Sequence, residues 1–459
     1  MDDRSYDVRI AELEQLVAEL RQTIAEKDAR IAELESELRQ RSQKYRPKAN
    51  TKPAPRKKVD RRRLPHRKHG YEFRPAPPSD ADVIHHDVDP HVCPFCDGTD
   101  LERIDDYDDH LQEELPQPKV EVHRDRRWKC RCRDCGRTSQ GRGDLELPGA
   151  HVGPRARLLM CYTRGHLGVS LGKGTDLLRE FFGLSLSRAG ALGHLRWGGL
   201  LCAPVVPRLW EILRDSPVVH ADETGWRVNG HNVWAWCFSN PKLALYLIGE
   251  RRNRAVLQQA LGDSLPGVLV TDFYAVYDAM ECPKQKCLVH LLRDLHQLRE
   301  QLPRRMVAGY IQPWIDLFQD AIALGKRREE LSEPGYNRAC RKIHDRFDEL
   351  LLERDIPNHD DCRRLWKRLF KHCGELFTFL AHPDVPSDNN SGERDIRSVV
   401  TLRNDGGTNR SQWGAKTLAA IKSVIRTCQK NERSFFDYGM CLVTARLTGQ
   451  PPPLPCDTS

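Results

Sequence analysis

The stretches VVHAD at residues 218–222 and VLVTD at residues 268–272 decide the fold class. Each is a short apolar run that ends in an aspartate, and such runs are typical of buried β-strands. Residues 233–238 and 243–248 predict two more strands, because turn residues separate these apolar runs from each other. A helix is expected over residues 255–261, between the third strand and the fourth.

Three strands in a meander, followed by a helix and a fourth strand, predict a mixed α/β sheet. The crossover helix would place the fourth strand parallel to the first. A helix bearing Tyr277 is expected after the fourth strand. Asp222 and Asp272 would then lie beside each other near the strand ends.

Neighbouring carboxylates repel each other unless a cation lies between them, and Mg²⁺ prefers carboxylate oxygens together with substrate phosphate. Asp222 and Asp272 are therefore candidate metal ligands, although both could instead cap strand ends. Glu223 is a rival to Asp222, and alternation sends the two side chains to opposite faces of the strand. The pattern alone does not decide between these two acids.

A third carboxylate could come from Glu393, in the first turns of a helix that begins near residue 388. A capping acid with surface ion pairs is the alternative for Glu393. Cys287 and His290, with Cys282, could hold a second metal ion. For these three residues we favour a buried thiol and a packing histidine.

The chain has 459 residues, which is enough for two or three domains with a sizeable core. Its hydrophobic content of 39% excludes a fully disordered protein. No apolar run approaches the length of about 18 residues that a spanning helix needs, and the N-terminus lacks a secretory pattern. We therefore expect a cytoplasmic protein without membrane contact. Its sixteen cysteines favour metal ligands and buried thiols over disulfides.

The positive charge is concentrated in one arm. Residues 41–70 hold thirteen Lys or Arg and one acid, a net +12, whereas the whole chain carries +8. Prolines and like charges oppose packing there, so residues 43–90 are predicted to be a basic disordered linker. Such an arm contacts DNA phosphates by counterion release, unless it is a solvated linker and nothing more. The candidate DNA contacts in the arm are Arg56, Lys57, Lys58, Arg61, Arg62 and Arg63.

Apolar residues from Ile10 to Leu38 recur at alternating steps of three and four, broken only at Lys27. This period is typical of a coiled-coil seam. Residues 1–42 are therefore predicted to be a coiled coil through which the chain forms homo-oligomers. A single amphipathic helix that packs on the body of the protein is the alternative.

Two Cys-x2-Cys pairs, Cys93 with Cys96 and Cys132 with Cys135, lie within a segment that we place at residues 91–145. Four thiolates are the ligand set that a structural Zn²⁺ prefers, so this segment is predicted to be a zinc-binding module. Cys130 is a spare thiol that could replace Cys132, and unligated cysteines are the alternative.

The other segments divide by composition. Residues 146–215 are expected to be helical, as a helix-turn-helix or as a plain connector. The core that holds the acids is expected in two parts, residues 216–300 and 386–445, with a helical subdomain inserted at residues 301–385. Residues 446–459 are predicted to be a disordered tail.

Four motifs occur in a fixed order along the chain. They are HADETGW at 220–226, VTDFYA at 270–275, CLVHLLRD at 287–294 and the pattern DNN-x2-ER at 388–394. With the N-terminal heptads, the cysteine pairs and a tail motif from Gly406 to Asn431, they resemble the transposases of the insertion sequence 66 family. The resemblance covers nearly the whole chain outside the basic arm and the proline-rich end.

The resemblance implies a ribonuclease-H-like catalytic core and a DDE triad of Asp222, Asp272 and Glu393 that holds Mg²⁺ or Mn²⁺. It selects these residues over Glu223 and over the acids that flank Glu393, which are Asp388 and Asp395. It implies a DNA transposase that cuts and joins phosphodiester bonds at the ends of its own mobile element. Small accessory transposition proteins are further expected partners.

Two other functions stay open at this point: a ribonuclease-H-like nuclease without strand joining, and a catalytically inactive DNA-binding regulator. Basic residues near the third acid are candidate phosphate contacts, since they would face the same DNA. They are Arg394 and Arg397, with Arg403 and Lys416 further along.

Overall fold

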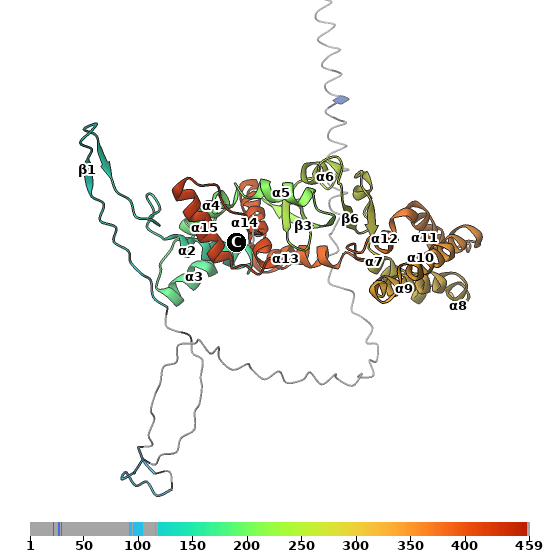
Figure 1. Ribbon diagram of the computed structural model, residues 1–459, viewed down its shortest axis with the longest axis horizontal. Helices are drawn as coiled ribbons and strands as arrows, with labels where there is room; N and C mark the ends of the chain where they lie inside the picture. The colour runs from blue at the N-terminus through green and yellow to red at the C-terminus, as the bar shows by residue number, and fades with distance from the viewer. Residues whose placement is uncertain are drawn as a thin grey trace, which may run out of the picture. The chain divides into compact units, whose positions relative to one another are not determined.

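The computed structural model describes residues 91–93, 95–103, 115 and 118–456, and four positions near residue 25 (Figure 1). The chain divides into two compact units, Met1–Leu115 and Pro116–Ser459, and the fold below is that of the second unit. The predicted coiled coil and basic linker lie outside the described residues, except that Gln22, Glu26, Lys27 and Ala29 are helical. Among the described helices, none combines the length and hydropathy that crossing a bilayer requires.

A five-stranded mixed sheet organises Pro116–Ser459, with the strand order β5-β4-β3-β6-β7. β3 pairs antiparallel with β4 and parallel with β6, while β6 pairs parallel with β7. This register confirms the predicted meander and the parallel pairing of its first strand with the fourth. The strands are β3 (Val218–Val228), β4 (His231–Ser239), β5 (Ala244–Gly249), β6 (Val268–Thr271) and β7 (Lys284–Lys286), and α6 (Arg254–Leu261) is the crossover helix.

The sheet differs from the sequence prediction in three places. Asp222 lies inside β3 rather than at its end, because β3 continues to Val228 in its pairing with β4. The parallel pairing with β6 stops at His220, so Asp222 lies just beyond it. β7 has the polar sequence Lys-Gln-Lys although all three residues are buried, and polar strands give no apolar signal. Tyr277 lies on a short 3₁₀ helix, η2 (Ala275–Ala279).

The two faces of β3 pack against different helices. α13 (Asn390–Gly406) and α14 (Gln412–Lys430) cover one face, where Ile396 packs with Trp226 of β3. The other face packs on α5 (Val206–Arg214) and α6, where Leu257 shares a core with Ala221. Since side chains alternate along a strand, Asp222 is on the α13 face and Glu223 on the α6 face.

The helices that precede the sheet share its core. Leu158 of α2 and Leu201 of α4 lie in the same hydrophobic cluster as Val219 of β3 and Ile421 of α14. Figure 1 shows α2, α4 and α15 gathered around α14. The bounds are α2 (Pro154–Gly165), α3 (Leu171–Phe182), α4 (Arg188–Cys202) and, at the C-terminus, α15 (Phe435–Thr448).

The segment between β7 and α13 is a helical insertion with its own core. Trp314, Phe318 and Phe347 pack there, and Leu288 joins them to Val270 of β6, which fixes the insertion to the end of the sheet. The elements are α7 (Leu288–Gln301), α8 (Arg304–Met306), the π-helix η3 (Val307–Ile311), α9 (Gln312–Lys326), η4 (Arg328–Glu330), α10 (Glu333–Asp348), the π-helix η5 (Glu349–Glu353), α11 (Asp360–Lys371), η6 (Cys373–Glu375) and α12 (Thr378–Ala381).

The described part of the C-terminal tail differs from the disorder that its prolines predict. The Tyr438 hydroxyl donates to the Pro453 carbonyl at 2.9 Å, and the Arg208 guanidinium donates to the Pro452 carbonyl at 2.6 Å. Leu454 is buried in the main core. Proline lacks an N–H but keeps its carbonyl, so a proline run can still be held through its acceptors.

Replacing Gly198 by Ala is expected to loosen the contact between α4 and α2. A Cβ at Gly198 would lie 2.2 Å from Cys161 Sγ, whereas a Cβ at Gly193 of the same helix meets nothing within 4 Å. We expect Gly198→Ala to lower the free energy of unfolding by about 1–3 kcal/mol through overpacking. Gly193→Ala, the matched control, should raise it by up to about 1 kcal/mol because alanine favours helix. Urea unfolding measures both, and equal effects would contradict the packing described.

Candidate functional site

Three acids from distant parts of the chain lie in or near β3. Asp222 lies in β3, Asp272 follows β6 directly and Glu393 is in the first turn of α13. Burial is the largest cause that raises the pKa of Asp222 to about 8, and the negative charges of Glu223, Asp272 and Glu393 raise it further. Asp272 and Glu393 therefore both lie within electrostatic reach of Asp222.

Backbone N–H groups orient two of these carboxylates. The Glu223 N–H donates to Asp222 Oδ1 at 2.8 Å, and the Tyr274 N–H donates to Asp272 Oδ1 at 2.9 Å. Ionised carboxylates only accept, so such a cluster attracts a cation or holds a proton. The raised pKa of Asp222 shows that, without a cation, the proton is favoured.

Glu223 occupies the opposite face of β3 and is fully engaged there. Its carboxylate accepts from Arg252 Nε at 3.1 Å and from the Tyr277 hydroxyl, and its side chain is 2% exposed. Arg252 in turn stacks on the ring of Tyr274. The local sequence pattern did not separate Asp222 from Glu223, and in the structure they lie on opposite faces of β3.

Asn389, a residue to which the sequence analysis gave no separate role, joins three elements at this site. It is buried, and its Nδ2 donates to the Ala221 carbonyl at 2.9 Å. Its Oδ1 is then the acceptor, so His220 Nδ1 donates to it at 2.9 Å. The Asn389 N–H donates to Cys287 Sγ at 3.2 Å, and its carbonyl accepts from the Glu393 N–H at 2.9 Å. Only its place in the DNN motif could have indicated this role.

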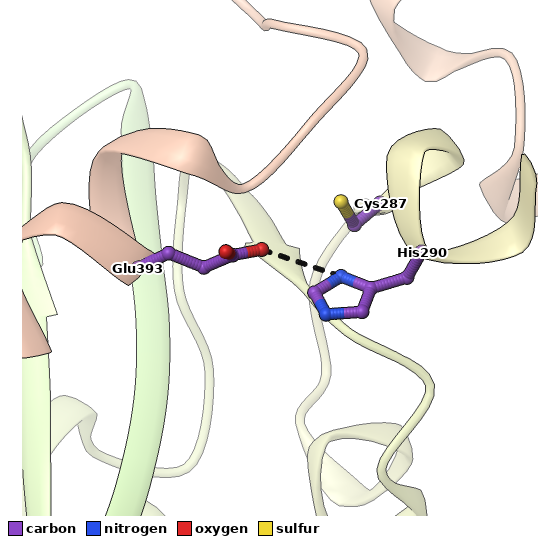
Figure 2. Close-up of side chains that lie close together, drawn as sticks. All are labelled: Cys287, His290 and Glu393. Atoms are coloured by element: carbon purple, nitrogen blue, oxygen red, sulfur yellow. Dashed lines mark ion pairs between the residues drawn. The ribbon is translucent and has the colours of Figure 1, made fainter. Parts of the chain in front are cut away.

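Glu393 turns toward α7 (Figure 2). Its Oε1 lies 3.5 Å from His290 Nδ1, and Cys287 is beside them. Within the described residues, two groups of three metal-ligating side chains have all their ligand atoms within 4.8 Å, and neither group contains Asp222 or Asp272. The three acids thus share one electrostatic environment without closing into a tight ligand set.

The candidate phosphate contacts near this site fall into two kinds. Arg394 and Arg397 are exposed on α13, and Lys416 is exposed on α14. Arg403 is instead used inside the fold, because its Nη1 donates to Thr224 Oγ1 at 3.2 Å and to the Gly225 carbonyl. The six arm residues from Arg56 to Arg63 lie outside the described residues.

Each of the two cysteine pairs lies in its own turn, and the two turns have the same backbone hydrogen bond. Cys93 N–H donates to the Gly98 carbonyl and Cys132 N–H to the Arg137 carbonyl, both at 2.8 Å and both five residues apart. N–H groups of the turn, that of Cys135 first, lower the pKa of Cys132. Cys130 lies on the hairpin strand β1 (Lys129–Arg131), opposite β2 (Thr138–Gln140).

The two pairs belong to separate compact units, Met1–Leu115 and Pro116–Ser459. The four-cysteine zinc site therefore stays a prediction. All sixteen cysteines are free thiols in the structure.

Comparison with known proteins identifies the family. Residues 152–417 match the family described as Transposase IS66 family, which is more than half of the chain. The chain belongs to this family. The matched segment runs from the start of α2 into α14 and so contains Asp222, Asp272 and Glu393.

Two proteins of Sinorhizobium fredii (strain NBRC 101917 / NGR234) are similar to this IS66-family chain. The uncharacterized protein y4jO is 30% identical over 153 residues, which cover 33% of this chain and 45% of that protein. The uncharacterized protein y4hP is 22% identical over 383 residues, which cover 75% of this chain and 68% of that protein. This chain thus spans under half the length of the first of these relatives.

Removing the Asn389 side chain is expected to weaken the junction between β3 and α13. Asn389→Ala leaves the buried Ala221 carbonyl and His220 Nδ1 without this partner, which should lower the free energy of unfolding by about 1–3 kcal/mol. Asn390→Ala is the matched control, because Asn390 is exposed, and its effect should stay within about 0.5 kcal/mol. Chemical denaturation of both variants measures the difference, and equal stabilities would argue against the junction.

Removing the buried charge at Asp222 is expected to stabilise the protein. The carboxyl ionises near pH 3.8 when unfolded and near pH 8 when folded, so the folded state loses stability as the pH rises through this window. Asp222→Asn should therefore raise the melting temperature when divalent ions are absent, and by more at pH 8 than at pH 5. Thermal unfolding at the two pH values measures this gain. A gain that did not grow with pH would contradict the electrostatic cause.

Proposed function

We propose that this chain is a DDE DNA transposase that cuts and joins DNA at the ends of an insertion sequence. The observation that carries the proposal is that Asp272 and Glu393, from distant parts of the chain, both act electrostatically on the largely buried carboxyl of Asp222. In the proposed reaction, water cleaves a phosphodiester bond and leaves a 3′-hydroxyl at the element end. That hydroxyl then attacks a phosphodiester of target DNA, which forms one such bond and breaks one.

The donor set at the site fits a hard divalent cation. Asp222, Asp272 and Glu393 would hold Mg²⁺ or Mn²⁺ through carboxylate oxygens, and their mutual repulsion is the cost that such an ion removes. A bound ion of this kind supplies an activated nucleophile and stabilises the leaving oxygen. The Glu223 and Tyr274 N–H groups orient the aspartates, and Asn389 holds Glu393 beside them.

The arrangement of the sheet supports a ribonuclease-H-like core for this function. An antiparallel meander is joined through β3 to the parallel strands β6 and β7, with Asp222 in β3 and Asp272 directly after β6. The exposed arginines Arg394 and Arg397 of α13 would contact DNA phosphates beside the acids.

The N-terminal half of the chain would serve DNA binding and assembly. Four thiolates from Cys93, Cys96, Cys132 and Cys135 would hold a structural Zn²⁺, and the same backbone hydrogen bond in the turns of the two pairs supports this. The basic arm would bind DNA non-specifically, and the N-terminal heptads would form homo-oligomers. Small accessory transposition proteins and a nucleoid-associated location in the cytoplasm belong to the same proposal.

Asp222→Asn is the decisive variant for this function. With DNA that carries the element ends and a target, and with Mg²⁺, the wild type should yield joined strands. Removing a group that only orients a metal ligand can lower activity by up to about a hundredfold. Loss of a metal-binding carboxylate should therefore lower the yield at least about a hundredfold. Asp388→Asn is the matched control, because that carboxylate only accepts from the Asn390 N–H in the turn before α13.

The products separate the proposal from its alternatives. Joined strands that require both Mg²⁺ and Asp222 support a transposase. Free ends without any joined strand would indicate a nuclease instead. Tight, salt-dependent DNA binding with no product in Mg²⁺ or Mn²⁺ would indicate an inactive regulator.

A further inference from the structure

Cys287, His290 and Glu393 bring three different metal-ligand atoms to one place. Cys287 caps the N-terminus of α7 and His290 lies in its first turn, so their spacing of three puts both on one face of the helix. Glu393 reaches them from the first turn of α13, as Figure 2 shows. The sulfur, nitrogen and oxygen atoms all lie within 4.8 Å of one another.

Two of these atoms are buried without satisfying their hydrogen-bonding capacity. His290 Nδ1 and Glu393 Oε1 face each other at 3.5 Å, yet neither has a hydrogen-bond partner among the described residues. Buried polar atoms are normally paired, and an unpaired one calls for a reason such as an ion. The side chains alone supply no such partner.

A second group, Asp278 with His372 and Glu375, shows how the fold balances acids when no ion is needed. Asp278 accepts from Lys286 Nζ at 3.0 Å and from Lys371 Nζ at 2.6 Å. Glu375 pairs with His372 at 2.7 Å. No lysine or arginine is ion-paired with Glu393 in the described part of the chain, so its group differs from this balanced one.

The ligand types select the ion. Thiolate and imidazole suit Zn²⁺ and similar borderline ions, whereas Mg²⁺ prefers carboxylates and water. Three protein ligands would leave the fourth tetrahedral position to water.

We propose that Cys287, His290 and Glu393 form a binding site for Zn²⁺ or a similar borderline divalent ion, separate from the four-cysteine module. The second part of the inference rests on the function proposed above. Because Glu393 is also the third acid of the DDE site, an ion held by Cys287 and His290 withdraws it from Asp222 and Asp272 and inhibits strand transfer. The site is thus an inhibitory metal switch at the junction of α7 and α13.

Cobalt binding tests the site without any DNA reaction. The full chain is freed of metal and titrated with Co²⁺, whose thiolate complexes absorb in the near ultraviolet. Against the wild type, Cys287→Ser should lose one equivalent of thiolate-bound Co²⁺, while the four-cysteine module contributes equally to both. His290→Gln and Glu393→Gln should bind that equivalent at least about tenfold more weakly.

Matched controls lie in the same region. Cys282→Ser removes a nearby thiol outside the group, and His296→Gln removes the histidine of α7 whose Nδ1 is also buried and unpaired in the described structure. Both should titrate as the wild type does. If thermal unfolding shows that Cys287→Ser does not fold, the variants His290→Gln and Glu393→Gln test the site instead, because both side chains are partly exposed. Identical titrations of the wild type, His290→Gln and Glu393→Gln would overturn the site.

Strand transfer in Mg²⁺ with increasing Zn²⁺ tests the switch. Activity is expressed relative to each variant's own value without Zn²⁺, and Cys287→Ser should need at least about tenfold more Zn²⁺ for half inhibition. Equal sensitivity of the two proteins would overturn the competition for Glu393. If Asp222→Asn joined DNA as well as the wild type, the proposed function would fail, while the cobalt titration would still decide the site.

Discussion

The site depends on the buried hydrogen bonds of one amide, Asn389. Its side chain binds the backbone of Ala221 and the ring of His220, and its N–H binds the sulfur of Cys287. Its carbonyl starts the hydrogen bonding of α13 at Glu393. Because a buried amide pays heavily for any missing partner, these bonds hold β3, α7 and α13 at one mutual position. A Cβ at Gly392 would lie 2.7 Å from Asn389 Oδ1, so the bare glycine lets the amide fit.

The acids of the site stand in conflict with the stability of the fold. Asp222 is largely buried and lies near other acids. Without a cation, burial and these like charges raise its pKa far above that of an exposed aspartate. Burial also raises the pKa of Glu223, its neighbour in the chain, but Arg252 and Tyr277 bind that carboxylate on the other face and oppose the shift. One strand thus carries an acid with a cationic partner and an acid with none among the described residues. An acid that the fold does not satisfy is the one available to a ligand.

Glu393 stands between two sets of possible partners, which links the helical insertion to the sheet. On one side are the carboxylates of β3 and β6, and on the other are the sulfur and nitrogen of α7. α7 packs in the core of the insertion through Leu288 and Leu291, and the same cluster reaches Val270 of β6. The insertion therefore helps to position the acids, and its helix α7 brings a thiol and an imidazole beside Glu393. Oxygen-only and sulfur-nitrogen ligand sets select different metals. In the two proposed sites, Glu393 would therefore be a ligand to two different kinds of ion.

Periodicity and turn residues determined much of the sheet, because apolar strands and their connections are local features of the sequence. They determined the meander, the crossover helix and the parallel pairing that brings Asp222 toward Asp272. The motif order determined the family and so pointed to Glu393. Local pattern could not predict β7, since the buried strand Lys284–Lys286 takes its stability from ion pairs with Asp278 and Glu375, which are made only in the folded chain. It could not separate Asp222 from Glu223 either. The family resemblance pointed to Asp222, and only the packing of α13 on one face and α6 on the other decided which helix each acid faces, because alternation along a strand sets opposite directions without saying what lies in each.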